Sequence, residues 1–111
     1  MNPKDVAERY FACIRARDLD GLAALYDANA TFVMPSGAEF AGAAAIREMH
    51  RGVFAASTSL TPNPVAMVVG EKSIAVEIEA QLSGGVIRRT ANFYHLSDEG
   101  RILSLHVYAQ G

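Results

Sequence analysis

The sequence predicts one α+β domain, with helices in the first half and a meander of antiparallel strands in the second. Apolar side chains recur at helical spacing in residues 3–17 and 42–56, whereas residues 73–82 alternate between apolar and polar. Turn residues such as Ser83-Gly84-Gly85 separate the later strands. The chain of 111 residues is long enough for a single hydrophobic core, so we expect residues 1–111 to form one domain.

Two helices are expected before the first strand. The first spans residues 3–17, where Pro3 suits the first turn and one face repeats at i, i+4, i+7 and i+8. That face consists of Val6, Tyr10, Cys13, Ile14 and Arg17. A second, short helix follows, and either Asp18 or Asp20 can serve as its N-cap. Its apolar face is expected to consist of Leu22, Leu25 and Tyr26.

A short strand is expected from Ala30 to Met34, because Pro35-Ser36-Gly37 then stops it. A third helix is expected from Gly42 to about Ala56, with one face formed by Ile46, Met49, His50, Val53 and Phe54.

The rest of the chain is expected to be strand. Prolines in Thr61-Pro62-Asn63-Pro64 place the first of these strands at a sheet edge, since proline cannot donate a ladder hydrogen bond. The strand segments are residues 65–69, 73–82, 86–96 and 102–109. In the second segment one side is apolar, and it consists of Ile74, Val76, Ile78, Ala80 and Leu82.

The turn after residue 82 decides which side chains of the flanking strands face inward. A three-residue loop pairs Leu82 with Val86 and Glu79 with Arg89, which keeps charge on the outer side, so we prefer this register. A two-residue Gly-Gly turn would bring Glu77 inward beside Asn92, because a slip by one residue flips every side chain.

Composition and charge exclude several classes of function. The net charge of -2, from 10 basic and 12 acidic residues, supplies no positive field for nucleic acid. No apolar run approaches the ~20 residues that span a bilayer, and the N-terminus lacks the apolar region of a signal peptide. We therefore expect a cytoplasmic protein that contacts neither nucleic acid nor membrane. Cys13 has no partner cysteine and the histidines lack zinc-ligand spacing, so we expect no metal and no other cofactor.

Three stretches of the chain resemble one protein family in their order and spacing. They are residues 9–35, residues 44–50 (Ala-Ala-Ile-Arg-Glu-Met-His) and residues 92–102, which begin Asn-Phe-Tyr-His-Leu. Together they resemble the ketosteroid isomerase and SnoaL-like group of the nuclear-transport-factor-2-like superfamily. The resemblance implies a cystatin-like α+β barrel, in which a curved antiparallel sheet wraps around three N-terminal helices and encloses a cone-shaped cavity. It also implies a homodimer formed through the outer face of the sheet.

The resemblance places site residues but breaks the inherited reaction. The isomerases move a proton with an aspartate and hold the oxyanion with a tyrosine and a protonated aspartic acid. Here Tyr10 matches the tyrosine, Met34 replaces the proton-moving aspartate, and Asn92 replaces the aspartic acid. An asparagine amide can donate to an oxyanion, whereas a thioether cannot abstract a proton. Steroid isomerisation therefore requires another base, for which Glu39 and Glu77 are candidates.

Further site residues follow from the same resemblance. Tyr26 and His50 match two tyrosines that hydrogen-bond the oxyanion tyrosine in some isomerases, so we expect a Tyr10–His50–Tyr26 cluster. That cluster is either a functional site or a buried polar network that satisfies its own hydrogen bonds. The candidate catalytic residues are Tyr10, His50 and Asn92. The candidate ligand-binding residues are Tyr26, Phe32, Met34, Phe54, Tyr94, Leu105 and Val107, for which ordinary core packing is the competing explanation.

Strand alternation completes the expected cavity. If Asn92 faces inward, then Thr90 and Tyr94 also do, while Phe93 and His95 face outward. Arg88 points inward near the mouth, where it either meets an anionic ligand group or extends into solvent.

Two functions remain open on these residues. One is a protein of the SnoaL-like type that binds a small apolar molecule, including a cofactor-independent isomerase, cyclase or hydrolase-type enzyme without the usual aspartate. The alternative is a non-catalytic dimeric binding or interaction module with a vestigial cavity.

Overall fold

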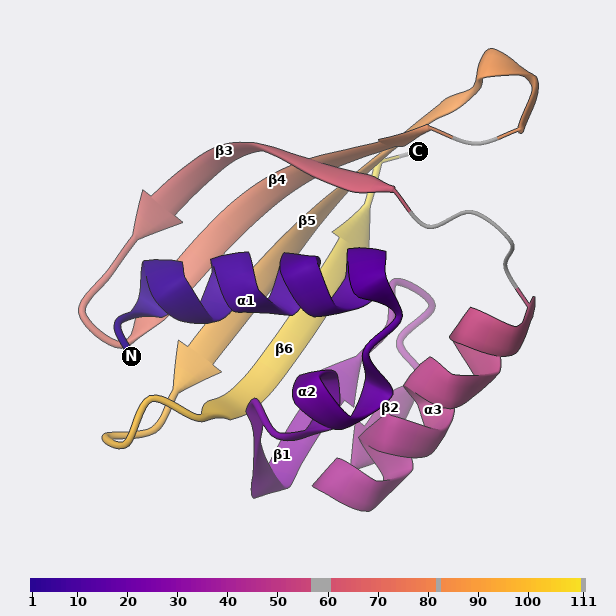
Figure 1. Cartoon of the computed structure of the whole chain (residues 1–111). Helices are drawn as coiled ribbons and strands as arrows, with labels where there is room; N and C mark the ends of the chain where they lie inside the picture. The colour runs from indigo at the N-terminus through magenta and orange to yellow at the C-terminus, as the bar shows by residue number, and fades with distance from the viewer. Residues whose placement is uncertain (57–60, 82, 111) are drawn as a thin grey trace.

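One curved sheet of six strands forms the body of the protein, and helices cover its concave face (Figure 1). The computed structural model describes residues 1–56, 61–81 and 83–110. The strand order is β2-β1-β6-β5-β4-β3. The helices are α1 (Pro3–Ala16), α2 (Leu19–Ala23) and α3 (Ala43–Ala56). The strands are β1 (Tyr26–Val33), β2 (Glu39–Ala41), β3 (Pro62–Val69), β4 (Ser73–Gln81), β5 (Ile87–Leu96) and β6 (Ile102–Ala109).

The expected α+β class and the curved sheet around N-terminal helices are confirmed. Neighbouring strands are antiparallel except for β1 and β6, which run parallel. This parallel pair joins the first strand of the chain to the last. It thereby connects the N-terminal half, which contains the helices, to the C-terminal strands.

Helix α1 has clear start and stop signals. The Asn2 side chain accepts a hydrogen bond from the Asp5 amide at 2.9 Å, and Pro3 occupies the first turn. The helix ends at Arg17, whose φ of 55° is left-handed and whose amide bonds back to Cys13 and Ile14. Arg17, at the end of α1, also contacts the last turn of α3.

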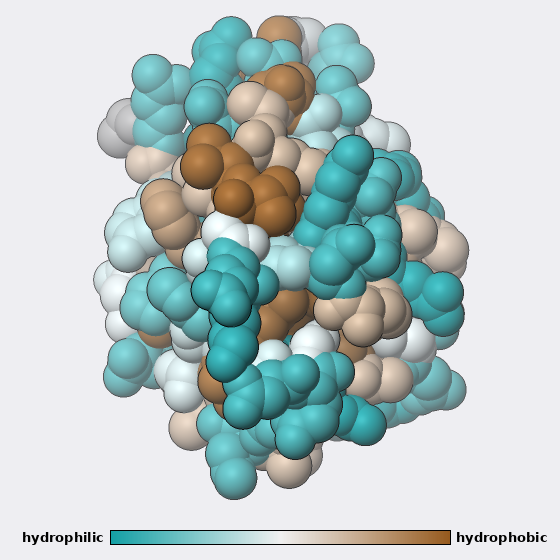
Figure 2. All heavy atoms as spheres, turned by 90° about the vertical axis from the view of Figure 1, so that its left-hand side faces the viewer, coloured by the Kyte–Doolittle hydropathy of each residue, from teal (hydrophilic) through white to brown (hydrophobic). Residues whose placement is uncertain are grey.

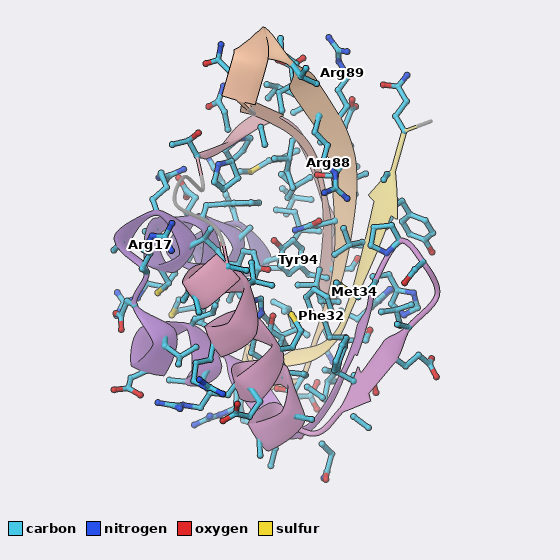
Figure 3. All side chains as sticks on the ribbon, turned by 90° about the vertical axis from the view of Figure 1, so that its right-hand side faces the viewer. Arg17, Phe32, Met34, Arg88, Arg89 and Tyr94 are labelled. Carbon is cyan, nitrogen blue, oxygen red and sulfur yellow. The ribbon has the colours of Figure 1, made fainter. Side chains whose placement is uncertain are left out.

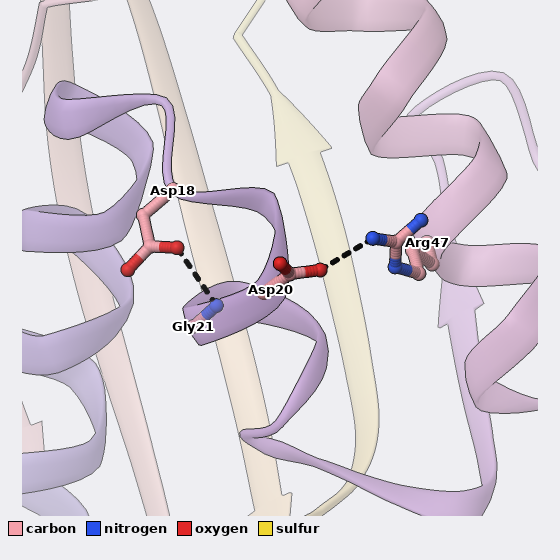
Figure 4. A network of polar contacts seen from close by, with 4 residues as sticks. All are labelled: Asp18, Asp20, Gly21 and Arg47. Carbon is pink, nitrogen blue, oxygen red and sulfur yellow. Dashed lines mark hydrogen bonds and ion pairs between the residues drawn. The ribbon is translucent and has the colours of Figure 1, made fainter.

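Helix α2 is held by its cap and by a contact to α3 (Figure 4). Asp18 is the N-cap and accepts from the Gly21 amide at 2.9 Å, which selects Asp18 over Asp20. A Cβ at position 21 would lie only 2.3 Å from an Asp18 carboxylate oxygen, so any larger residue there would displace the capping side chain. Asp20 instead forms an ion pair with Arg47 of α3.

The expectation for Tyr26 and for the start of the first strand was wrong. Helix α2 ends at Ala23, and Tyr26 begins β1 instead of completing a helix face. The reason is long-range pairing, because the Ile102 amide donates to the Leu25 carbonyl at 2.8 Å and Tyr26 pairs with Ile102. Strand β2, which pairs with β1, was not predicted, since three residues are too few to show a periodicity.

The preferred hairpin register is confirmed. Glu79 pairs with Arg89 and Val76 pairs with Asn92, so Asn92 faces inward. The Arg89 Nε lies 3.4 Å from a Glu79 carboxylate oxygen on the outer side. Leu82, which the prediction paired with Val86, lies outside the described residues.

The strand expected to start at Val65 begins three residues earlier, at Pro62, whereas the bounds of the later strands agree with the prediction to within one residue. Strand β3 lies at the sheet edge, as its prolines predicted, and its register shifts between Pro64 and Ala66. The core lies between the helices and the concave face, where Tyr94, Leu105 and Ile102 are fully buried.

Candidate functional site

A cavity of about 290 Å³ lies between α1, α3 and the concave face of the sheet. Its volume is close to the lower end of the roughly 300–1,000 Å³ typical of ligand pockets. The polar side chains that line it are Tyr10, Arg88, Thr90 and Asn92. The other lining residues are Phe11, Ile14, Phe32, Met34, Pro35, Val53, Pro62, Ile78, Ala80 and Val107. In Figure 3, Phe32 and Met34 lie between α3 and the sheet.

The predicted site residues divide between the cavity surface and the layer behind it. The lining residues among them are Tyr10, Phe32, Met34, Asn92 and Val107. The buried residues that do not line the cavity are Tyr26, His50, Tyr94 and Leu105. Phe54 is half-buried and packs against His50. The layer behind the cavity therefore supports the lining residues and does not offer its own atoms to a ligand.

The structure brings Tyr10, Tyr26 and His50 together from three different elements. The Tyr26 hydroxyl lies 3.2 Å from His50 Nε2, which links β1 to α3. A side-chain hydrogen bond joins Tyr26 to Tyr10 of α1. This bond lowers the pKa of Tyr10 and raises that of Tyr26. Of the three side chains, Tyr10 lines the cavity, so its hydroxyl is the one that a ligand can reach.

Burial controls the protonation state of His50. Its ring is 5% exposed and packs between Phe32 and Phe54, with ring centroids 5.5 and 6.3 Å away. Desolvation lowers the pKa of His50 to about 4, so the imidazole is neutral near pH 7. A neutral imidazole has one donor and one acceptor nitrogen. The tautomer of His50 therefore sets the direction of its hydrogen bond with the Tyr26 hydroxyl.

Burial also keeps the tyrosines neutral. It raises the pKa of Tyr10 well above its ordinary value, and the hydrogen bond with Tyr26 opposes this only in part. The pKa of Tyr94 is raised for the same reason, with a further increase from the nearby Tyr10. These tyrosines act as hydrogen-bond donors and not as bases at neutral pH.

Asn92 is the second polar group at the inner end of the cavity. Its Nδ2 donates to the Tyr94 hydroxyl at 3.0 Å, and this bond orients the amide. The ring of Tyr94 meets the ring of Tyr10 edge-on, with centroids 5.4 Å apart. An asparagine amide has two N–H donors, so one remains for a ligand that lies between Tyr10 and Asn92.

None of the lining residues of this cavity is an aspartate or a glutamate. The register in which Glu77 faces the cavity is wrong, because Glu77 pairs with Ala91 on the outer face and is exposed. Glu39 is also exposed, on β2, where it pairs with Val33. Met34 thus lines the cavity without a replacement carboxylate beside it.

Sequence reasoning missed one contact that shapes the site. Arg17 donates from its guanidinium to the Phe54 carbonyl at 2.6 Å, and its charge lies 5.9 Å from the centre of the Phe54 ring. The arginine thereby satisfies a carbonyl in the last turn of α3 and holds Phe54 against His50. No local pattern around Arg17 could reveal this, because the contact spans 37 residues.

The sequence matches the SnoaL-like domain over residues 7–105. The chain belongs to the SnoaL-like family. No curated protein matches it.

Solved structures agree with the family. A SnoaL-like protein from Burkholderia thailandensis is 16% identical with a TM-score of 0.85, and the match covers 97% of this chain and 94% of the other. The epoxide hydrolase/cyclase-like enzyme SalBIII, described in pyran ring formation in the polyether salinomycin, is 24% identical with a TM-score of 0.81 and coverages of 96% and 89%. A candidate polyketide cyclase from Sinorhizobium meliloti is 21% identical with a TM-score of 0.81 and coverages of 93% and 93%. At these identities the likeness shows the fold of the SnoaL-like family, and the chemistry must be argued from the site.

Within residues 1–56, 61–81 and 83–110, no helix is long and apolar enough to cross a membrane. In the same part of the chain, no group of three or more His, Cys, Asp or Glu side chains could hold a metal ion.

The neutral state of His50 predicts a pH dependence of stability. The folded pKa of about 4 lies below the value of about 6.5 for an exposed histidine, so the unfolded chain binds more protons between these pH values. The stability contributed by neutral His50 is therefore complete above about pH 6.5 and is lost as the pH falls toward 4, by at most about 3 kcal/mol. Urea unfolding of the wild type and His50→Gln at pH 4.5 and 7 measures this loss. The wild type should lose more free energy of unfolding than the variant, and equal losses would contradict the assignment.

Proposed function

We propose that the cavity binds a small, largely apolar molecule and that Tyr10 and Asn92 donate hydrogen bonds to its carbonyl or hydroxyl oxygen. The protein would then act on this molecule without a cofactor, in a reaction of the isomerase, cyclase or hydrolase type. One observation supports this proposal above the others: two buried donors from α1 and β5 line an otherwise mainly apolar cavity.

The chemistry available to these donors is stabilisation of negative charge on the ligand oxygen. A neutral Tyr10 that donates to the ligand would end a chain of hydrogen bonds that runs from His50 through Tyr26. In enzymes that hold an oxyanion, one such donor is worth about 10²–10³-fold in rate. His50 acts through Tyr26 and is therefore a positioning residue.

The absence of a carboxylate from the cavity lining limits the reaction class. Met34 cannot take a proton, and the buried tyrosines are too weakly acidic to be present as bases near pH 7. Reactions in which the substrate supplies its own nucleophile, such as ring closure by an internal hydroxyl, need less from the protein than carbon-acid isomerisation does. The likeness to SalBIII and to the candidate cyclase is consistent with this class.

A homodimer through the outer face of the sheet is the second part of the proposal. We define the outer face by its exposed apolar residues Val68, Phe93 and Tyr108, which are 73%, 44% and 55% exposed. The rings of Phe93 and Tyr108 meet edge-on at 5.7 Å and form an apolar centre on two adjacent strands. Figure 2 shows further apolar side chains that interrupt the polar surface on another side of the molecule. The exposed apolar area on the outer face of the sheet favours association with a second copy of the chain. The apolar outer face is equally consistent with the alternative function, a non-catalytic dimeric module.

The oxygen site is tested with a matched pair of probes, 1-tetralone and the hydrocarbon tetralin, which lacks the ketone. Tyr10→Phe and Asn92→Leu should each weaken 1-tetralone binding about 3–10-fold, the value of one neutral hydrogen bond, and leave tetralin binding unchanged. Isothermal titration calorimetry measures both affinities. Tyr108→Phe removes a hydroxyl from the outer face and serves as the control, with no effect expected.

Two results would count against this function. If wild-type protein binds tetralin as tightly as 1-tetralone, the donors do not recognise the oxygen. If neither probe enters the cavity, the non-catalytic module is the better account.

The dimer is tested by Phe93→Lys, which places a charge at the centre of the outer face. The variant should be monomeric in size-exclusion chromatography with light scattering at a concentration where the wild type is dimeric. Ala12→Lys, on the exposed side of α1, is the control and should remain dimeric. A monomeric wild type, or a dimeric Phe93→Lys, would refute this interface.

A further inference from the structure

Arg88 lies at the mouth of the cavity without a partner from the protein. It faces inward on β5, where it pairs with Ala80, and it lines the cavity while remaining exposed (Figure 3). Among residues 1–56, 61–81 and 83–110, Arg88 makes no hydrogen bond and no ion pair. Its neighbour Arg89 faces the other side of the sheet and pairs with Glu79. A guanidinium has five N–H donors, and those of Arg88 are thus all available to a ligand.

The polar side chains of β5 form a line from the mouth to the inner end of the cavity. Arg88, Thr90 and Asn92 alternate along the strand, so they share its inner face. Four residues of an antiparallel strand span about 14 Å. The three residues therefore offer a charge at one end, a hydroxyl between, and an amide beside Tyr10 at the other end. The rest of the lining is mainly apolar, which suits the hydrocarbon part of an extended ligand.

The charges around the mouth favour an anion. In the part of the chain that the structure describes, no carboxylate lines the cavity, so none there competes with a ligand for Arg88. Arg15 of α1 donates to the carbonyl of the lining residue Pro62 at 3.2 Å, which brings a second positive charge to the rim. Among the described residues, Arg88 is the one charged residue that lines the cavity. A single planar guanidinium in the lining matches the two oxygens and the single charge of a carboxylate.

We propose that the substrate class is amphipathic keto or hydroxy carboxylic acids, whose carboxylate binds Arg88 and whose ketone or hydroxyl oxygen lies at Tyr10 and Asn92. This inference rests on the proposed function, since it adds a second anchor to the same cavity. Arg88 sets which ligands are accepted, because a neutral ligand of the same shape gains nothing from the guanidinium. It also fixes which end of the ligand enters first.

The experiment uses 5-oxo-5-phenylpentanoate and its neutral primary amide, which differ only in the group expected at Arg88. Calorimetry at pH 7.5 measures both affinities for the wild type, Arg88→Gln and Arg89→Gln. The wild type should bind the carboxylate about tenfold more tightly than the amide, since a charge-assisted hydrogen bond is stronger than a neutral one. Arg88→Gln should abolish the preference. Arg89→Gln removes one positive charge from the neighbouring residue on the outer side, and this variant should retain the preference for the carboxylate.

The outcomes separate this inference from the proposed function. Equal affinities for the two probes in the wild type, or equal loss of the preference in both arginine variants, would overturn the role of Arg88. In either case, amide binding that weakens in Tyr10→Phe still supports the oxygen site. If neither probe binds the wild type, the inference and the function fail together. Both arginines are exposed, so neither exchange removes a core contact.

Discussion

The hydrogen bond between Tyr26 and His50 is the contact on which the site depends most. It joins β1 to α3 at 3.2 Å, and Tyr26 in turn bonds Tyr10 on α1. All three side chains are at most 5% exposed, so each needs a hydrogen-bond partner in the protein or in the cavity. The positions of two helices and a strand are thereby tied to one chain of donors and acceptors. This series of hydrogen-bonded groups ends at the Tyr10 hydroxyl, which lines the cavity.

The polar chain shows which groups line the cavity where the isomerases have their base. In the isomerases that the chain resembles, an aspartate moves the proton, and Met34 occupies that position here. Neither Glu39 nor Glu77 faces the cavity, so no carboxylate has taken its place there. Neutral donors remain, at Tyr10 and Asn92, and they can bind an oxygen whether or not charge develops on it. The site therefore favours recognition and polarisation of an oxygen over proton abstraction.

Much of the fold follows from local patterns in the sequence, and the exceptions have one physical cause. Alternation along residues 73–82 and the length of the Ser83–Gly85 turn correctly predicted that Asn92 faces inward and Glu77 outward. The start of β1 at Tyr26 could not be predicted in this way, because it depends on pairing with Ile102 far along the chain.

The site shows the same division between local and long-range information. The resemblance placed Tyr10, Tyr26 and His50 near one another, and the structure brings them together. Tyr94 and Leu105 were predicted to contact ligand because they face inward, but helix packing buries them behind the lining. The Arg17–Phe54 contact joins the ends of two helices and has no counterpart in any local pattern.

The central claim is that a ligand oxygen bonds to the Asn92 amide and the Tyr10 hydroxyl inside the cavity. The most direct measurement is a proton–nitrogen spectrum that follows the side-chain amide of Asn92 while 1-tetralone is added. We expect one of its two Nδ2 protons to shift downfield as the ligand saturates, and tetralin to leave that proton in place. Saturation by 1-tetralone with both Asn92 protons unmoved would contradict the claim.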